Sequence, residues 1–171
     1  MGNGFAYTVM SVWPLLAIYW YKTKSIQSAT LWTIIGGFMF LPVLTKLDLP
    51  LVPALGKHSI PVLSALLGCY FVAKKRVGFF DNKGILKVLV MLLFISPLLT
   101  VLTNKESVVV GGRFLPGLTG HDAISLIISQ LLFVAPFFLG RRFFRTYEDQ
   151  LLLFKTLVFS GVVYSGFILF E

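Results

Sequence analysis

Six apolar stretches fill almost all of this chain, and short basic or Pro/Gly-rich connectors separate them. The stretches cover residues 5–21, 29–44, 60–73, 85–103, 123–139 and 150–170. The hydrocarbon core of a bilayer is about 30 Å thick, and a helix of about 20 residues crosses it. The sequence therefore predicts an all-α, polytopic membrane bundle of about six transmembrane helices.

The composition supports the same fold class. Hydrophobic residues make up 57% of the 171 residues and charged residues only 13%, whereas about 25% of the residues in a soluble domain are charged. The connectors are too short to hold a separate soluble domain. We therefore expect residues 1–171 to form one transmembrane helical domain.

Two of the stretches are short for a membrane span. Residues 60–73 make a helix of about 21 Å at about 1.5 Å per residue. A helix that continues past the basic residues 74–76 toward Phe79 spans the core while those side chains reach the surface. Otherwise this stretch is re-entrant or interfacial. The stretch 29–44 is also short, and Thr45 can lengthen it.

The basic residues predict an orientation. Ten of them lie in or beside the connectors after the first, third and fifth stretches: Lys22, Lys24, Lys74, Lys75, Arg76, Lys83, Lys87, Arg141, Arg142 and Arg145. The connectors after the second and fourth stretches hold four: Lys46, Lys57, Lys105 and Arg113. Because basic residues in short loops remain in the cytoplasm, both termini are predicted to lie outside.

Several function classes are excluded by missing motifs. The chain has no Gly-x-Ser-x-Gly, no Walker loop, no His-Glu-x-x-His and no pair of cysteines,. Its two histidines and seven carboxylates are scattered, so we expect no metal site and no cofactor. The net charge of +8 is explained by topology and by contact with anionic membrane lipid, without a nucleic-acid partner.

The first connector predicted to lie outside is proline-rich and amphipathic. Its prolines favour extended backbone, so we expect it to lie along the membrane surface. Lys57 and His58 are candidates for binding a substrate there. The alternative is interfacial anchoring, with Ser59 capping the third helix and Pro61 in its first turn.

The second outside connector contains a glycine turn. Residues 108–112, VVVGG, predict a short extended piece and a tight turn, with Arg113 directly after it,. Arg113 has a fixed fork of donors that suits a phosphate, or it is an interfacial anchor. Thr119 and Asp122 fit a helix capping box, so Asp122 is expected to be structural. His121 can act as an acid or base near neutral pH, although an exposed histidine usually does not.

Polar residues also occur inside the last two stretches. The fifth carries Ser125, Ser129 and Gln130, and the sixth carries Lys155, Thr156, Ser160, Gly161, Tyr164 and Ser165. Such stripes usually pack helix on helix. Gln130 and Lys155 are nevertheless candidate functional groups, because a polar or charged residue inside a membrane helix often marks a functional site. The alternative for Lys155 is that it reaches the cytoplasmic surface.

Three segments, taken in order, carry a resemblance to a known family. They are FLPVLTKLDLPLVPALGKHSIP at 40–61, SPLLTVLTN at 96–104 and VGGRFLPGLTGHDAIS at 110–125, and GRRFFR at 140–145 continues the series. This ordered set resembles the N-terminal half of bacterial O-antigen ligase/polymerase-like integral membrane proteins. The resemblance extends through the sixth stretch and covers nearly the whole chain.

The resemblance implies a GT-C-like helical enzyme at the outer face of the bacterial inner membrane. Such enzymes transfer or polymerise glycan from an undecaprenyl-diphosphate carrier without a nucleotide-sugar donor. Cationic residues hold the diphosphate in that family, and Arg113 is the position that we match to this role. Further candidates at the outside face are Lys57, His58 and His121.

The chain departs from that family in length, because family members continue into a large outer loop that supplies essential basic residues. We therefore expect this chain to be the N-terminal part of a larger system, to be inactive alone, and to associate with a C-terminal half or another helical membrane subunit. The alternative is a non-catalytic small integral membrane subunit: a scaffold, a transporter component or an assembly partner.

Overall fold

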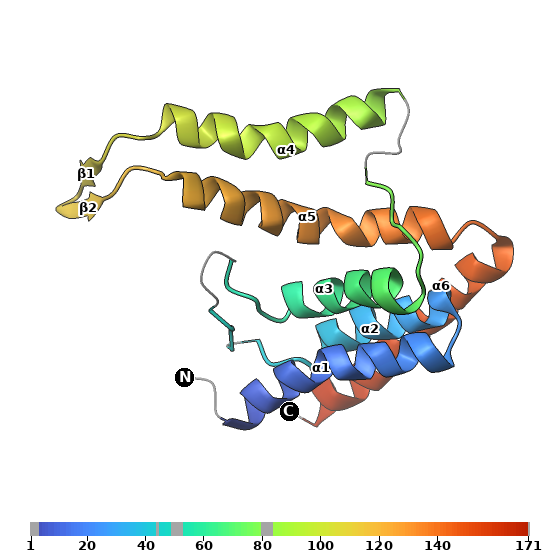
Figure 1. Ribbon diagram of the computed structural model, residues 1–171. Helices are drawn as coiled ribbons and strands as arrows, with labels where there is room; N and C mark the ends of the chain where they lie inside the picture. Colours follow the sequence, from blue (N-terminus) through green and yellow to red (C-terminus); the bar gives the residue numbers. More distant parts are fainter. Residues whose placement is uncertain (1–3, 44, 49–52, 80–83, 171) are drawn as a thin grey trace.

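The computed structural model describes residues 4–43, 45–48, 53–79 and 84–170. These residues form six α helices, a short π-helical segment and a two-stranded sheet (Figure 1). In chain order the elements are α1 Gly4–Thr23, α2 Ile26–Phe40, α3 Ser59–Leu67, η1 Gly68–Val72, α4 Ile85–Thr103, β1 Val108–Val110, β2 Arg113–Leu115, α5 Gly120–Phe143 and α6 Tyr147–Leu169. Each of the six predicted apolar stretches therefore contains a helix.

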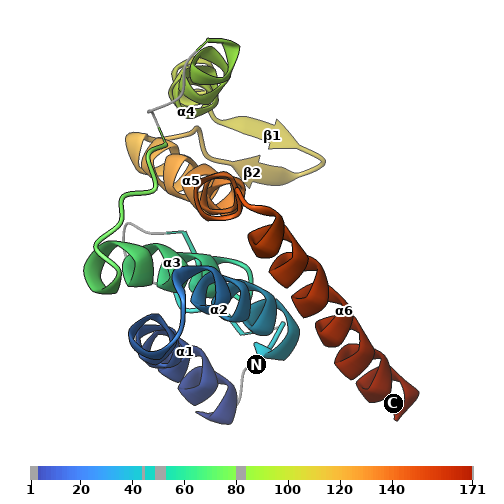
Figure 2. The same cartoon turned by 90° about the vertical axis from the view of Figure 1, so that its right-hand side faces the viewer.

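The helices are arranged around α3. It packs against α1, α2 and α5, whereas α4 packs on α5 and α6 on α2. Figure 2, which looks along the bundle, shows α4 on the far side of α5 and α6 running obliquely away from it. The two helices α4 and α6 thus lie at opposite margins of the molecule.

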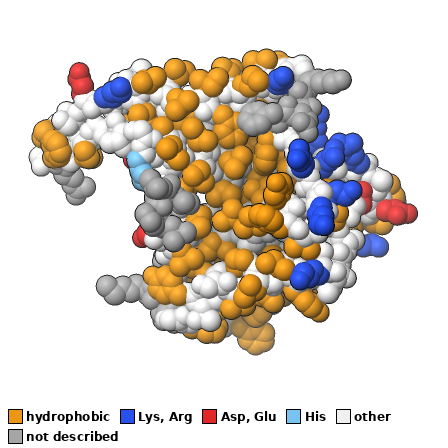
Figure 3. Space-filling view, viewed as in Figure 1, with side chains coloured by type: hydrophobic (Ala, Val, Ile, Leu, Met, Phe, Trp, Pro, Cys, Tyr) orange, Lys and Arg blue, Asp and Glu red, His pale blue; other side chains and the backbone are white. Residues whose placement is uncertain are grey.

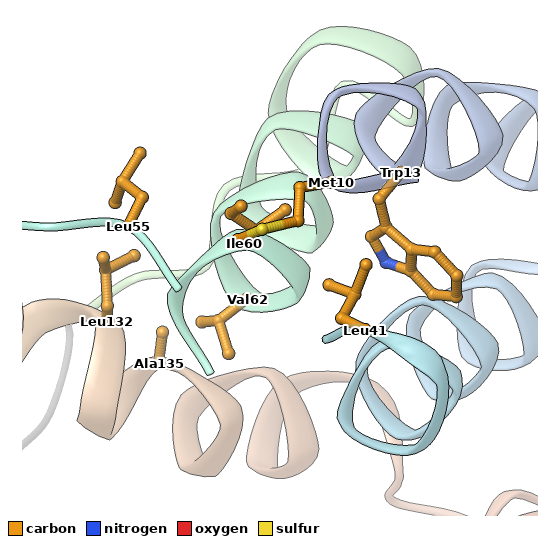
Figure 4. Packing of buried hydrophobic residues seen from close by; sticks show 8 residues of the cluster. All are labelled: Met10, Trp13, Leu41, Leu55, Ile60, Val62, Leu132 and Ala135. Atoms are coloured by element: carbon orange, nitrogen blue, oxygen red, sulfur yellow. The ribbon is translucent and has the colours of Figure 1, made fainter. Parts of the chain in front are cut away.

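Apolar side chains from α1, α3, α5 and the connector between α2 and α3 meet in the centre of the bundle (Figure 4). The buried members of this cluster are Met10, Trp13, Leu41, Leu55, Ile60, Val62, Leu132 and Ala135. The indole Nε1 of Trp13 donates a hydrogen bond of 3.1 Å to the carbonyl of Thr33. This bond satisfies the one polar atom that Trp13 brings into the core.

Glycines permit the closest helix contacts. A Cβ atom at Gly37 of α2 would collide with the ring of Pro61 in α3, and one at Gly68 would collide with the ring of Tyr21 in α1. Small residues at helix crossings let the backbones approach closely. These two glycines therefore set the distances between α3–η1 and its neighbours.

A buried chain of hydrogen bonds joins η1, α1 and α2. The Sγ of Cys69 donates to the hydroxyl of Tyr21 at 3.3 Å. The Tyr21 hydroxyl lies 2.7 Å from Oγ1 of Thr30. Because the Thr30 hydroxyl donates its own hydrogen to the carbonyl of Ile26, Tyr21 must be the donor to Thr30. The Tyr21 hydroxyl is therefore fully paired inside the bundle.

We expect Tyr21→Phe to lower the free energy of unfolding by about 1 kcal/mol, because Cys69 and Thr30 each lose a buried partner. The measurement is unfolding of the purified chain in mixed micelles, followed by tryptophan fluorescence. Tyr19→Phe is the matched control, because Tyr19 is 60% exposed. Equal stability of the two variants would contradict a role for the hydrogen-bonded chain.

The predicted end of the second helix is wrong, and one of the two alternatives for the third stretch does not occur; backbone geometry explains both. Helix α2 ends at Phe40 rather than near Thr45, because Leu41 is extended and precedes Pro42, which disfavours helical backbone before it,. The end predicted at Leu44 lies outside the described residues. Helix α3 and η1 stop at Val72, and Lys74 takes a positive φ of 53°. The continuation toward Phe79 does not form.

The start of α3 also differs from the prediction. His58, not Ser59, is its N-cap, and its side chain makes no capping bond. The Ser59 hydroxyl instead accepts a hydrogen bond of 3.3 Å from the N–H of Gly56 in the preceding loop. Pro61 lies in the first turn of α3 as predicted.

Within the described residues, three helices are long and apolar enough to cross a membrane: α4, α5 and α6. Helix α2 and the continuous helix Ser59–Val72 are apolar but shorter. Proline occurs inside α4 at Pro97, which has no N–H for the carbonyl of Leu93. The Ser96 hydroxyl donates to that carbonyl at 2.9 Å instead, so α4 continues through the proline.

Candidate functional site

The two ends of the bundle differ in charge. The connectors α1–α2 and α5–α6, the end of η1 and the start of α4 lie at one end, on the right in Figures 1 and 3. This basic end carries Lys22, Lys24, Lys74, Lys75, Arg76, Lys87, Arg141, Arg142 and Arg145. Lys83 lies outside the described residues. The opposite end, called the hairpin end, holds β1, β2, the α2–α3 loop and the start of α5 (Figure 1).

The hairpin projects between α4 and α5. Gly111 and Gly112 have φ values of +56° and +78°, as a two-residue turn of type I′ requires. Val110 pairs with Arg113 across this turn. The turn predicted from VVVGG is thus confirmed. It fixes the backbone of Arg113 at the first position after the turn, far from the basic end.

The base of the hairpin is closed by backbone contacts. The N–H of Leu118 donates to the carbonyl of Asn104 at 2.8 Å, and Gly117 lies against the backbone of Lys105 without room for a Cβ atom. Val109 and Phe114, which are paired across the strands, are 69% and 67% exposed. The hairpin therefore presents apolar side chains at this end of the bundle.

Asp122 has the structural role that the sequence predicts. Its carboxylate accepts hydrogen bonds of 2.8 Å from both the N–H and the hydroxyl of Thr119. This pairing satisfies groups at the start of α5. His121 is exposed beside it in the first turn. The start of α5 therefore offers one free imidazole and no free carboxylate.

A cleft of about 310 Å³ opens among α2, α3, α5 and the loop before α3. Most of its lining is apolar. It is formed by Phe38, Pro53, Ala54, His58, Ser59, Val62, Ser129, Leu132, Phe133 and Pro136. Figure 3 shows the molecule notched at the hairpin end, between the projecting hairpin and the helices below it.

Polar groups line part of this cleft. The exposed imidazole of His58 packs edge-on against Phe38, with 5.4 Å between ring centroids. Ser59 lies beside it in the chain, and Ser129 approaches from α5. Pro136 has no N–H to donate to the carbonyl of Leu132. An apolar chain therefore fits the cleft, and a polar group fits beside His58.

Gln130 adjoins the cleft residue Ser129 on α5. Its Oε1 atom is buried and has no hydrogen-bond partner among the described residues. A buried amide oxygen without a partner is costly. Gln130 is therefore a polar group available to a donor that enters between the helices.

The candidate residues predicted from the sequence divide into three places. His58 lines the cleft, and Lys57, which is half-buried, precedes it in the chain. Arg113 and His121 lie at the same end of the bundle, on β2 and α5. Lys155 is exposed on α6, away from the cleft. No group of three or more metal-ligating side chains occurs in the described part of the chain.

The sequence did not indicate Phe38 or Pro136 as site residues. Both are ordinary members of apolar helices, and only the packing of α2 and α5 on α3 brings them to one cleft. The one signal in the sequence that could have indicated the cleft is that Pro136 lies in the same helical stretch as Ser129.

Comparison of the chain with family models, with curated proteins and with solved structures found no match. The arrangement of the site is therefore the basis for any functional assignment.

Proposed function

We propose that this chain binds undecaprenyl-diphosphate-linked glycan at the outer face of the bacterial inner membrane. It does so as the membrane portion of an O-antigen ligase/polymerase-like system that transfers or polymerises that glycan. The cleft beside His58 is the observation that carries the proposal. Its apolar lining suits part of a polyprenyl chain, because burying each methylene group stabilises a complex by about 0.8 kcal/mol.

The charge distribution supports the orientation. The basic end carries nine described Lys and Arg residues, and such an excess marks the cytoplasmic side. The hairpin end, with the cleft, then faces outside, where a lipid-linked glycan is used. In this orientation α1 and the shorter helices α2 and α3–η1 would join α4, α5 and α6 in a bundle of about six spans.

The head group of the carrier is the second part of the proposal. A diphosphate is best held by donors in a fixed fork, which an arginine supplies. Arg113 follows a turn that projects from the hairpin end, and Lys57 and His58 lie in the loop at the same end. The Arg113 and Lys57 side chains are the cations that would stabilise the diphosphate as it leaves the sugar, and His58 offers a further polar group beside them.

The test is binding of a photoactivatable polyprenyl diphosphate to the purified chain in nanodiscs. We expect Ser129→Phe to weaken binding about tenfold, since the added ring displaces about two methylene groups from the cleft. Ser125→Phe is the matched control, because Ser125 lies one turn earlier on α5 and does not line the cleft. Unchanged binding in Ser129→Phe, in a folded protein, would contradict the proposal.

The head group is tested separately with the uncharged polyprenol. Arg113→Ala should weaken binding of the diphosphate and leave binding of the polyprenol unchanged. Equal loss for both ligands would remove Arg113 from diphosphate binding.

A second candidate function is a non-catalytic membrane subunit. One observation favours it: only 11% of the apolar window of α6 is buried, and α6 packs chiefly on α2. This candidate predicts tight association with another helical membrane protein and no binding of polyprenyl diphosphate.

A further inference from the structure

One face of α6 is used for packing inside the chain. Thr156 and Ser160 are its buried side chains. Phe159 contacts Trp32 of α2, with 5.9 Å between ring centroids, and Phe167 contacts Phe40 at 6.4 Å. These residues recur at intervals of three, four and seven, so they form one stripe along the helix.

The adjoining face of α6, which shares Phe159 with the packing stripe, carries an open groove of about 460 Å³. Its lining residues are Phe154, Lys155, Val158, Phe159 and Val162. Val158 and Val162 are separated by one helical turn, so the groove runs along the helix axis. Lys155 is the one charged member of the lining.

Lys155 is an exposed lysine within the apolar part of α6. It is eight positions after Tyr147, about 12 Å along the helix axis from the basic end. Among the described residues it has no acidic partner. Side chains on a helix point toward its N-terminus, so the ammonium group is directed to the basic end. An exposed ammonium group directed toward the membrane surface is stabilised by an anionic head group.

We propose that this groove binds one anionic phospholipid. The lipid phosphate pairs with the ammonium group of Lys155, and an acyl chain lies along Val158 and Val162. Charge complementarity selects the lipid. The nearby basic end carries nine described Lys and Arg residues but only two described acidic residues, Glu148 and Asp149, so it attracts an anionic head group. The site lies on α6, away from the cleft, and does not depend on the function proposed for that cleft.

The experiment uses the full chain in nanodiscs that contain a photoactivatable phosphatidylglycerol or phosphatidylcholine with the same acyl chains. Cross-linked peptides are identified by mass spectrometry. We expect phosphatidylglycerol to label residues 151–163 about fivefold more than phosphatidylcholine, the contribution of one lysine near an anionic head group. Lys155→Gln should remove this preference, and Lys155→Arg should keep it.

Lys24→Gln is the control for general attraction to the basic end, because Lys24 is exposed on another connector. It should leave the preference on α6 intact. Equal labelling by the two lipids, or an unchanged preference in Lys155→Gln, would overturn the proposal. Disulfide-linked dimers of Val158→Cys in a Cys69→Ser background would also overturn it, since a second copy of the chain would then fill the groove.

Discussion

Gly37→Ala is expected to lower the free energy of unfolding by about 2 kcal/mol, the usual cost of inserting a methyl group into a fully packed contact. A Cβ atom at this position would collide with the pyrrolidine ring of Pro61, and the indole of Trp13 lies 3.1 Å from it. Neither ring has a flexible end that can move aside. The α2–α3 crossing must therefore separate, and the core around Trp13 opens with it.

The measurement compares Gly37→Ala with Gly161→Ala in mixed micelles, by tryptophan fluorescence during unfolding. Gly161 lies inside α6 with nothing within 4 Å of an added Cβ atom, so alanine there should stabilise the chain by about 0.5–1 kcal/mol. A Gly37→Ala protein as stable as the original chain would show that α2 and α3 do not pack as described. Opposite signs for the two substitutions are the expected result.

The sequence was a good guide to where helices lie, because a long apolar run has few alternatives. Residues 85–103 were predicted as a helix, and α4 has those limits. The ends set by single residues were harder to predict. Hydropathy alone favours continuation of α2 past Phe40, but Pro42 ends it. The positive φ of Lys74 ends the α3–η1 helix where the basic residues 74–76 begin.

The sequence was a poor guide to which helix faces meet. A membrane helix is apolar on all sides, so apolar periodicity does not distinguish its packed face from its lipid-facing side. The stripe on the sixth stretch illustrates this. Thr156 and Ser160 are buried, but Gly161 and Ser165, which have the same small-residue spacing, are exposed. The cleft could not be predicted either, because its residues come from three helices and a loop.

Exposed apolar surface is the strongest structural indication of a membrane. In α4 only 17% of the apolar window is buried, and α6 is less buried still. Exposed apolar patches larger than a few hundred Å² are rare on soluble monomers. A bilayer covers such surfaces without a partner protein, and the basic end then lies where anionic head groups neutralise it.

Cysteine labelling of the membrane-inserted chain tests the orientation on which the proposed function depends. Single cysteines replace Glu106 at the hairpin end, or Lys24 or Arg142 at the basic end, in a Cys69→Ser background. All three positions are exposed. We expect an impermeant reagent added outside intact cells to label position 106 and to leave positions 24 and 142 unlabelled. Labelling at positions 24 and 142 with protection of position 106 would place the cleft in the cytoplasm and contradict the account.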